Sequence, residues 1–546
     1  MRPGDKKFMS TVREVTYELL RDLGMTVIFG NPGSNELPFL KDMPSDFQYF
    51  LGLHERSAAG MALGYAMARR EPVFVNLHSI ASAGNGLSAV IDAFYGHVPL
   101  VITTGQQDRR QLLTEPFLIS RAVEVVRPYV KWAYEPLCAV DVPAAIAQGY
   151  YIATQPPQGP VLISIPMDDW NHTCQPLNAR KVTRTVFPNP EALDEVVRAL
   201  NSSRKPALVV GAQIEEDGAW NETIALAEHL GADVYQEPIP SRWVFPRSHP
   251  LFRGSLPPAQ RPLSDLLANC DTVVVLGAPV FLYYTYVPGD PIKPGTKLFQ
   301  ITNSPADAAR AQAGTTIVGN LFFAMEYIRS HAEGKGCNQP GRQEAPLQAA
   351  ADYPITPNYL FSTLNRLLPA DAIIVEECPS SKGDLDRNIR LEQPCSFYSV
   401  RSGILGFGLP TAVGLQLAHS RRRVVCPVGD GSAQYSIQTL WSAAQYNAPV
   451  IFIVVQNGDY SALKGFCDFT NVGKNVPGTN IPGIDMVKIA DGYGVPGCRV
   501  DRPEELEPAL REAFAASGPF LVSVNVRNGV QTCMGMDRSV NPPNYG

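Results

Sequence analysis

Short apolar runs alternate with helix-like segments along most of the chain. In the first block, Thr11 and Glu14 fit a capping box at the start of a helix that Gly24 can close. Three apolar runs follow, with helix-like segments between them: MTVIFG, FQYFLGLHE and PVFVNLH, at residues 25–30, 47–55 and 72–78. Such alternation is typical of parallel β-α-β units.

Two further blocks repeat this alternation. The second begins after the loop near residue 175 and holds PALVVGA, DTVVVLGAP and KLFQITN; the third holds AIIVEE, RRVVCPVGDG, PVIFIVVQN and FLVSVNV. Between them, residues 332–357 are rich in Gly, Pro and polar residues and predict a linker. We therefore expect an α/β protein with three doubly wound parallel-sheet domains, at residues 1–180, 181–340 and 355–546. The low similarity between the first and third blocks leaves open whether they share a fold.

Length, charge and cysteine content narrow the class of protein. A chain of 546 residues is too long to fold around one hydrophobic core and suggests about three domains. The net charge of -6, with Lys and Arg scattered, argues against a nucleic-acid partner. No apolar run reaches the length of about 18 residues that suggests a membrane span, and the first residues lead into a helix pattern rather than a signal peptide. The ten cysteines show no C-x-x-C pair, which favours free thiols in a reducing compartment. These features predict a cytoplasmic protein without a membrane partner.

The most informative stretch is VGDGSAQYSIQTLWSAAQYNAPVIFIVVQNGDY, residues 428–460. It predicts a strand that ends at Gly429-Asp430-Gly431, an amphipathic helix over residues 433–446, and a second strand that ends on Asn457. The apolar face expected for this helix consists of Ile437, Leu440, Trp441 and Ala444. One right-handed crossover places Asp430 and Asn457 at the same edge of a parallel sheet, where such sheets bind ligands.

Asp430 and Asn457 both offer oxygen, the ligand atom that Mg²⁺ prefers together with phosphate and water. The two glycines beside Asp430 permit close backbone approach, and a helix N-terminus attracts an anion. A metal-bridged diphosphate would use all of these features. A simple Gly-Asp-Gly turn with an Asn at a strand end is the alternative, because turns favour these residues.

The unit from Gly-Asp-Gly-Ser to Asn-Gly resembles the thiamin-diphosphate binding motif. Further stretches that carry the resemblance are GNPGSNELPFLKDMP (30–44), LHE ending at Glu55, NLHSIASAGNGLSAV (76–90), VKWAYEP (130–136), PPQGPVLISIPMDDW (156–170), GAPVF (277–281), GFGLPTAVGLQLA (406–418) and LWSAAQYN (440–447). Over nearly its whole length the chain resembles the benzoylformate decarboxylases, which are thiamin-diphosphate-dependent 2-keto acid decarboxylases. The resemblance implies a pyrimidine-binding first domain with the catalytic Glu, a central domain, and a third domain that binds diphosphate and Mg²⁺.

The resemblance implies three catalytic residues, Glu55, His78 and Ser34. The Glu55 carboxyl group would hydrogen-bond to the pyrimidine ring of the cofactor and favour its imino form. His78 and Ser34 would contact substrate and relay protons, which suits a His because it titrates near neutral pH. By itself, Glu55 is more typical of an ordinary Glu at a helix N-terminus, where the dipole stabilises it. A strand-end His is often only solvent-exposed or bonded to a loop.

The implied cofactor is thiamin diphosphate with Mg²⁺, for which Ca²⁺ can substitute; the resemblance argues against FAD. The implied metal ligands are Asp430, Asn457 and the backbone carbonyl of Asp459. Gly403 would offer its carbonyl to the aminopyrimidine, and Leu405 would support the bent cofactor. The other implied cofactor-binding residues are Gly429, Gly431, Ser432, Asp459 and Tyr460.

The implied substrate pocket favours an aromatic or bulky apolar acyl group, although apolar residues at these spacings are also ordinary core. Its residues are Tyr284, Leu118, Ala462, Leu463 and Phe466. At Tyr284 the family has a second active-site His, and a Tyr hydroxyl, with a pKa of about 10, is a weaker acid. Tyr284 is alternatively only a pocket wall. The chain also departs from the family at Pro379, in place of a hydroxyl residue, and at Gly465, in place of a large aromatic.

The predicted function is decarboxylation of an aromatic 2-keto acid such as benzoylformate to an aldehyde and CO₂. The change at Tyr284 favours a second reaction, that of a carboligase or aldehyde lyase that forms or cleaves 2-hydroxy ketones. An acetohydroxyacid-synthase-like enzyme with FAD fits less well, because the resemblance over the whole chain lies elsewhere. Glu55, Asp430 and Asn457 argue against a cofactor-binding protein without turnover.

The expected partners are a small 2-keto acid or an aldehyde. The family implies a homo-oligomer, with a dimer as the minimum unit and a tetramer as the usual one.

Overall fold

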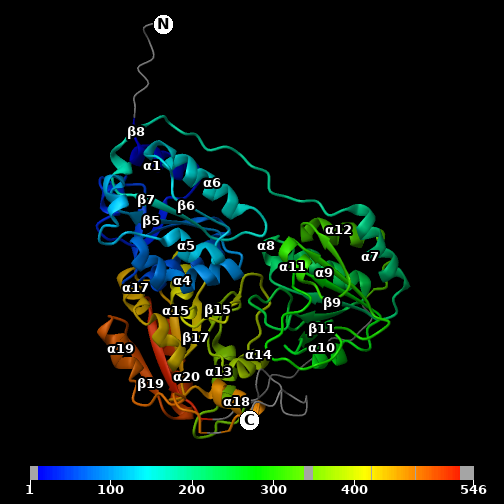
Figure 1. Ribbon diagram of the computed structural model, residues 1–546. Helices are drawn as coiled ribbons and strands as arrows, with labels where there is room; N and C mark the ends of the chain where they lie inside the picture. The colour runs from blue at the N-terminus through cyan, green and yellow to red at the C-terminus, as the bar shows by residue number, and fades with distance from the viewer. Residues whose placement is uncertain (1–9, 337–348, 420, 474, 529–546) are drawn as a thin grey trace. The chain divides into compact units, whose positions relative to one another are not determined.

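The computed structural model describes residues 10–336, 349–419, 421–473 and 475–528. Within these ranges, three six-stranded sheets form the framework, and every strand pair inside them is parallel (Figure 1). The predicted α/β fold with three doubly wound parallel sheets is confirmed. A short antiparallel pair, β1 (Ser10–Thr11) with β8 (Thr173–Cys174), lies outside the three sheets. No helix in the described part of the chain is long and apolar enough to cross a membrane.

The first sheet has the strand order β3-β2-β4-β5-β7-β6. Its strands, in chain order, are β2 (Val27–Asn31), β3 (Gln48–Leu51), β4 (Val73–Leu77), β5 (Leu100–Gln106), β6 (Trp132–Tyr134) and β7 (Val161–Pro166). Helices α1 (Val12–Asp22) and α6 (Val142–Thr154) cover the face that includes Ile28. The next residue along β2, Phe29, points to the opposite face, where its ring lies 5.5 Å from that of Tyr65 in α3 (Glu55–Arg69). Helices therefore cover both faces of the first sheet.

The predicted capping box at the start of α1 is present. The Thr11 hydroxyl accepts a hydrogen bond from the Glu14 backbone N–H, and the Glu14 carboxylate accepts one from the Thr11 backbone N–H.

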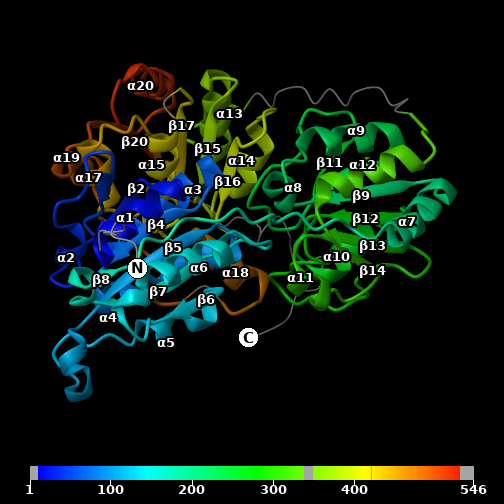
Figure 2. The same ribbon diagram turned by 90° about the horizontal axis from the view of Figure 1, so that it is seen from above.

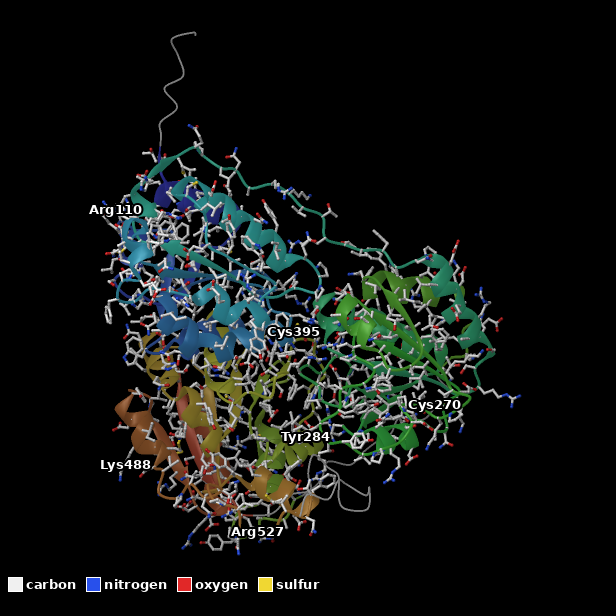
Figure 3. The ribbon with its side chains drawn as sticks, in the orientation of Figure 1. Arg110, Cys270, Tyr284, Cys395, Lys488 and Arg527 are labelled. Atoms are coloured by element: carbon white, nitrogen blue, oxygen red, sulfur yellow. The ribbon has the colours of Figure 1, made fainter. Side chains whose placement is uncertain are left out.

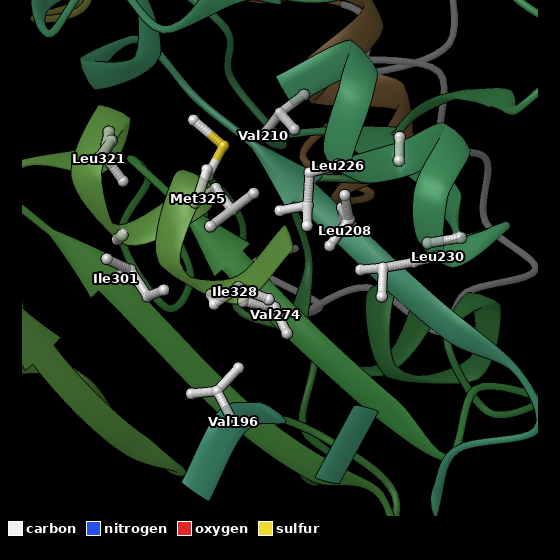
Figure 4. Close-up of a cluster of buried hydrophobic side chains, with 14 of the residues drawn as sticks. Val196, Leu208, Val210, Leu226, Leu230, Val274, Ile301, Leu321, Met325 and Ile328 are labelled. Atoms are coloured by element: carbon white, nitrogen blue, oxygen red, sulfur yellow. The ribbon is translucent and has the colours of Figure 1, made fainter. Parts of the chain in front are cut away.

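The second sheet has the strand order β11-β10-β9-β12-β13-β14. Its strands are β9 (Pro206–Val210), β10 (Asp233–Gln236), β11 (Phe252–Ser255), β12 (Thr272–Leu276), β13 (Lys297–Thr302) and β14 (Thr315–Val318). One face packs against α7 (Pro190–Ser202), α9 (Trp220–Leu230) and α12 (Leu321–His331), and Figure 4 shows part of this apolar cluster. The other face packs against α10 (Gln260–Leu266). Strands β9, β12, β13 and β14 run side by side in Figure 2.

The third sheet has the strand order β16-β15-β17-β18-β20-β19. Its strands are β15 (Ile373–Glu376), β16 (Phe397–Ser399), β17 (Val424–Gly429), β18 (Ile451–Gln456), β19 (Gly497–Val500) and β20 (Phe520–Asn525). Helices α13 (Pro357–Leu367), α14 (Lys382–Asn388) and α20 (Pro503–Ala515) cover one face. With the strands of each sheet numbered in chain order, the first and third sheets both read 2-1-3-4-6-5, whereas the second reads 3-2-1-4-5-6. The first and third sheets therefore share a topology, which the sequence left open.

The single helix predicted over residues 433–446 is wrong. Three short elements replace it: α16 (Asp430–Ala433), a 3-10 turn (Gln434–Ser436) and α17 (Thr439–Gln445). Of the predicted apolar face only Leu440 is fully buried, while the small or polar Thr439, Ser442 and Ala443 are buried beside it. The chain thus buries short side chains here in place of a continuous apolar stripe. Because no long helix forms over residues 433–446, the dipole of such a helix is not available to attract an anion.

Internal contacts divide the chain into two compact units. One comprises Met1–Arg184, Ser402–Ser420 and Ser436–Ala448, and the other comprises Thr185–Arg401, Arg421–Tyr435 and Pro449–Gly546. The first unit includes α15 (Gly408–Ala418) because this helix packs closely on α3, where a Cβ on Gly414 would lie 1.9 Å from the Met61 carbonyl oxygen. The three predicted domain boundaries stay a prediction, and residues 337–348 of the predicted linker lie outside the described residues.

Candidate active site

Glu55 is the first residue of α3 and does not end a strand, since β3 already stops at Leu51. Its side chain is buried. Oε1 accepts a 2.8 Å hydrogen bond from the Ser82 hydroxyl, and Oε2 accepts one of 3.1 Å from Asn85 Nδ2. Both donors belong to α4 (Ser79–Tyr95). The carboxyl group is therefore held in a fixed orientation by the helix that follows His78.

His78 directly follows β4 and is the N-cap residue of α4. Its backbone N–H donates to Ser82 Oγ over 2.8 Å, so the same hydroxyl links His78 to Glu55. The imidazole Nδ1 lies 2.9 Å from Glu36 Oε2, and 19% of the His78 side chain is exposed. The structure thus brings together the predicted residues Glu55 and His78.

Ser34 lies in the turn after β2, where its side chain is exposed and its hydroxyl donates to Asn35 Oδ1 over 3.1 Å. The adjacent Gly33 lies against the His78 ring, since a Cβ on Gly33 would come within 2.3 Å of His78 Cγ. Gly33, the residue before Ser34, thus places the Ser34 turn beside the His78 ring.

A loop anchored on α3 carries Gly403 and Leu405. Arg56 Nε donates to the Gly406 carbonyl over 3.1 Å, and Arg56 forms a buried 2.7 Å ion pair with Asp92. Ser402 donates its hydroxyl to the same Asp92. Gly403 has a φ of 80°, a conformation that favours glycine. These contacts fix the Gly403 segment relative to the helix that begins at Glu55.

Asp430 and Asn457 lie at the same edge of the third sheet, as predicted. The register pairs Gly429 of β17 with Val455 of β18, and each predicted ligand follows the end of its strand. Asp430 Oδ2 accepts from the Gly458 N–H over 2.8 Å, which ties the carboxylate to the neighbouring strand end. Burial raises the pKa of Asp430, although backbone N–H donors oppose the shift.

The other predicted cofactor residues of the third sheet surround Asp430. Gly431 has no room for a side chain, since a Cβ there would lie 2.5 Å from the Tyr460 ring. Ser432 is buried in α16. The Asp459 carboxylate forms a 2.7 Å ion pair with Lys464, so the side chain already has a cationic partner. That Asp459 offers its backbone carbonyl to a metal stays a prediction.

Four of the predicted pocket residues lie in the second compact unit. Tyr284, labelled in Figure 3, makes an edge-to-face contact with Phe466 of α18 (Ser461–Phe469), with ring centroids 5.9 Å apart. Phe466 also packs on Ala259, Val287 and Phe469. Leu463 is half exposed, and the Ala462 N–H donates to Ser380 Oγ over 3.0 Å. Leu118 lies in the first unit, with a φ of 64°.

Several residues of the site were missed by the sequence reasoning. They are Glu36, Ser82, Asn85 and Lys464, which hold the predicted residues through side-chain contacts. The stretches GNPGSNELPFLKDMP and NLHSIASAGNGLSAV contain the first three, but their spacing gives no sign of which side chains meet.

The described residues fit thiamin diphosphate with a divalent cation. The Asp430 carboxylate and the Asn457 amide supply oxygen, and the crowding at Gly431 shows a backbone that only glycine allows. No cluster of three or more His, Cys, Asp or Glu suited to a metal occurs in the described part of the chain. A site with one carboxylate, one amide and one backbone carbonyl does not depend on such a cluster.

Family models match all three sheet-bearing regions. The N-terminal TPP binding domain of thiamine pyrophosphate enzymes matches residues 10–121, the central domain matches residues 193–326, and the C-terminal TPP binding domain matches residues 380–524. Each model therefore falls on one of the three sheets.

The chain is also similar to individual proteins over nearly its full length. It is 43% identical to benzoylformate decarboxylase of Pseudomonas aeruginosa over 94% of this chain and 99% of that protein. The acetolactate synthase large subunit of Haemophilus influenzae is 26% identical, over 94% of each chain. A solved thiamine diphosphate-dependent 4-hydroxybenzoylformate decarboxylase of Rhodococcus jostii RHA1 is 41% identical, with a TM-score of 0.92 over 96% of this chain and 100% of that one.

Benzoylformate decarboxylase from Polynucleobacter necessarius is 37% identical, with a TM-score of 0.94 over 96% of this chain and 100% of that one. Fold, strand-end residues and these similarities agree with one another. The chain belongs to the thiamine pyrophosphate enzymes and, among them, to the family of the benzoylformate decarboxylases.

Proposed function

We propose that the protein is a carboxy-lyase that converts an aromatic 2-keto acid of the benzoylformate type to an aldehyde and CO₂. The observation that carries this proposal is the 43% identity with a benzoylformate decarboxylase over 94% of the chain. The acetolactate synthases are more distant, at 26% identity for the Haemophilus influenzae protein. This difference favours decarboxylation over an acetohydroxyacid-synthase-like reaction with FAD.

Thiamin diphosphate, when bound, would supply a nucleophilic carbon and a sink for the electron pair left by CO₂. Glu55 holds and exchanges a proton at its carboxyl group, toward the pyrimidine ring of the cofactor. Its two hydrogen bonds, from Ser82 and Asn85, keep that carboxyl in one orientation. His78 delivers a proton through its imidazole to the reacting carbon after CO₂ has left, and Ser34 helps to orient the substrate carboxylate.

The third sheet is proposed to hold the diphosphate through a divalent cation, Mg²⁺ or its substitute Ca²⁺. Asp430 and Asn457 supply side-chain oxygens, and Asp459 supplies its backbone carbonyl. Gly429, Gly431, Ser432 and Tyr460 line the same strand ends, and Gly403 and Leu405 would contact the rings of the cofactor. The tie between Asp430 and the Gly458 N–H supports this assignment, because it sets the carboxylate beside the strand end that carries Asn457.

The acyl side of the pocket is proposed to include Tyr284, Phe466, Leu463, Ala462 and Leu118. The edge-to-face pair of Tyr284 and Phe466 supports an aromatic acyl group, since a further ring can join such a pair. The predicted homo-oligomer, with a dimer as its minimum and a tetramer as its usual form, and the predicted cytoplasmic location belong to the same proposal. So do the domain boundaries at residues 1–180, 181–340 and 355–546.

The test of this function is CO₂ release from benzoylformate with purified protein. The assay is run with thiamin diphosphate and Mg²⁺ together, with either one omitted after chelation and dialysis, and with neither. The proposal predicts CO₂ and benzaldehyde in equal amounts only with both present. A protein that binds the cofactor but releases no CO₂ from any aromatic 2-keto acid would instead be a binding protein without turnover.

A second function, carboligation, is favoured by one observation. The Tyr284 ring contacts Phe466, and the family resemblance implies that a His would stand at this position. A weaker acid at this position would leave the reacting carbon unprotonated for longer, so that an aldehyde could capture it and form a 2-hydroxy ketone.

A further inference from the structure

Glu36 is a buried acidic residue to which the proposed reaction gives no role. It follows the turn after β2, and only 1% of its side chain is exposed. Its Oε1 accepts from the Gly105 N–H over 2.8 Å, and its Oε2 accepts from the Gly33 N–H over 2.9 Å. The same Oε2 lies 2.9 Å from His78 Nδ1. A buried carboxyl group with three polar contacts, one of them to the predicted proton donor, suggests a role beyond that of a turn residue.

The two backbone contacts of Glu36 restrict which ring nitrogen of His78 can carry a hydrogen. A backbone N–H only donates, so both Glu36 oxygens act as acceptors toward Gly105 and Gly33. When Glu36 is ionised, the His78 nitrogen that faces it must donate, and Nδ1 then carries a hydrogen. The other ring nitrogen, Nε2, is left as the one that can gain or lose a proton. Burial raises the pKa of Glu36, and the contacts with Gly33, His78 and Gly105 oppose that rise.

Close packing holds the Glu36 and His78 side chains in place. A Cβ on Gly105 would lie 2.1 Å from Glu36 Oε1, and one on Gly33 would lie 2.3 Å from His78 Cγ. Both side chains therefore fit only against glycine. From the other side, the backbone N–H of His78 donates to Ser82 Oγ, which in turn donates to Glu55. His78 is thus fixed at its ring by Glu36 and at its backbone by the Ser82 hydroxyl that also binds Glu55.

We propose that Glu36 is a positioning residue that holds His78 in the tautomer with hydrogen on Nδ1, so that Nε2 exchanges the proton of the reaction. This proposal rests on the role of His78 in the proposed function. Glu36 acts through His78 and contacts neither substrate nor cofactor in this account. Two titratable groups of the described residues lie near the pair. Burial and, after it, the charge of Glu36 raise the pKa of Tyr49 of β3. Glu55 of α3 is connected to His78 through Ser82.

Two substitutions separate positioning from simple packing. Glu36→Gln keeps the shape but has only one acceptor oxygen, so its amide must place an N–H group against Gly105 or against Gly33 and His78. In the second arrangement the amide donates to Nδ1 and reverses the tautomer. Glu36→Asp keeps both acceptor oxygens on a shorter stem and should restore part of the effect. Glu71→Gln, at a carboxylate with 61% side-chain exposure, is the matched control.

The direct readout is the ¹⁵N spectrum of the histidine ring nitrogens in sedimented holoenzyme labelled with ¹⁵N-histidine. The His78 signals are assigned as those that disappear in His78→Asn. The proposal predicts hydrogen on Nδ1 of neutral His78 in the wild type, in Glu36→Asp and in Glu71→Gln. In Glu36→Gln it predicts a reversed tautomer only for the arrangement in which the amide N–H faces the ring. An Nε2–H tautomer in the wild type would overturn it. This readout stands even if the wild type decarboxylates no 2-keto acid, so failure of the proposed function is seen separately.

A kinetic cycle gives the second readout. Glu36→Gln should lower kcat for benzoylformate about tenfold or more in the wild-type background, but less than about twofold in a His78→Asn background, because residues that act as a unit are not additive. An equal loss in both backgrounds would show that Glu36 acts without His78 and would contradict the proposal.

Discussion

The hydroxyl of Ser82 donates a 2.8 Å hydrogen bond to Glu55 Oε1. The same hydroxyl oxygen accepts the backbone N–H of His78 over 2.8 Å. The Glu55 side chain and the His78 backbone are therefore joined through one small residue in the first turn of α4. A change at Glu55 should affect the proton chemistry of the cofactor without loss of the fold, because Asn85 and Ser82 remain as hydrogen-bond partners for an amide.

Glu55→Gln should slow hydrogen–deuterium exchange at C2 of bound thiamin diphosphate. The amide keeps the side-chain volume but cannot hold and release a proton as a carboxyl group does. The expected loss is about 100-fold or more, which corresponds to about 2.7 kcal/mol in activation free energy. Quenched-flow exchange followed by NMR of the extracted cofactor measures it, with Glu71→Gln as the control. An exchange rate equal to that of the wild type would reject the role of Glu55.

Asp430→Ala should abolish Mg²⁺-dependent retention of thiamin diphosphate. The substitution removes a carboxylate from the proposed metal site and leaves the Gly458 N–H without its acceptor. Asp430→Asn, which keeps an acceptor oxygen but not the charge, should weaken binding less. Equilibrium dialysis with and without Mg²⁺ measures the affinity, and Asp491→Ala, at an exposed position of α19 (Met486–Gly492), is the control. Unaltered Mg²⁺-dependent affinity for thiamin diphosphate in both Asp430 variants would contradict the assignment of Asp430 as a metal ligand.

Tyr284→His should lower the share of 2-hydroxy ketone when benzoylformate and excess aldehyde are supplied together. A His is a better proton donor near neutral pH than a Tyr, so protonation should compete more strongly with capture by aldehyde. The ratio of ligated product to free aldehyde should fall several-fold, while decarboxylation persists because His78 remains. Tyr286→His, two residues away and 69% exposed, is the control. A ratio that stays the same or rises in Tyr284→His would show that Tyr284 is only a pocket wall.

Asp217→Asn should stabilise the protein at pH 8 but not at pH 4.5. Burial raises the pKa of Asp217 from 3.8 to about 6, so the folded state binds this proton more tightly than the unfolded state does. Stability conferred through this group therefore falls as pH rises from about 4 through about 6. The amide removes that loss and keeps an oxygen for the Leu321 N–H, which Asp217 Oδ2 accepts over 2.8 Å.

The expected gain from Asp217→Asn at pH 8 is about 1–2 kcal/mol, since a shift of one pKa unit corresponds to about 1.4 kcal/mol and part of the effect is screened. Apparent unfolding temperatures of the variant and the wild type at both pH values measure it. A gain of the same size at pH 4.5 would mean that hydrogen bonding, rather than the charge of Asp217, is the cause.

The parts of the fold that follow from local pattern were predicted from the sequence. Thr11 and Glu14 cap α1 as expected, and Asp430 and Asn457 meet at one sheet edge, because parallel register follows from strand order once the crossover is right-handed. The helix over residues 433–446 was not predicted correctly, since its apolar spacing gave no sign that the chain breaks at Gln434–Ser436. In this segment tertiary packing of Thr439 and Ser442 outweighs periodicity.

The contacts that orient the site lay beyond sequence reasoning. Glu36 and His78 are 42 residues apart, and Ser82 and Glu55 are 27 residues apart. No spacing rule connects such pairs, because the distance between them is set by the arrangement of β2, β4 and α4 around the first sheet. The roles predicted for the site residues came from the family resemblance, and they stay predictions until the variants above are measured.

Comparison of benzoylformate with pyruvate tests the central claim most directly. Burial of a phenyl group in place of a methyl group is worth about 2–3 kcal/mol, so the account predicts that kcat/KM for benzoylformate exceeds that for pyruvate about 100-fold. The product expected from benzoylformate is benzaldehyde with an equal amount of CO₂, formed only with thiamin diphosphate and a divalent cation. A higher kcat/KM for pyruvate, with acetolactate as the product, would contradict the assignment as an aromatic 2-keto acid decarboxylase.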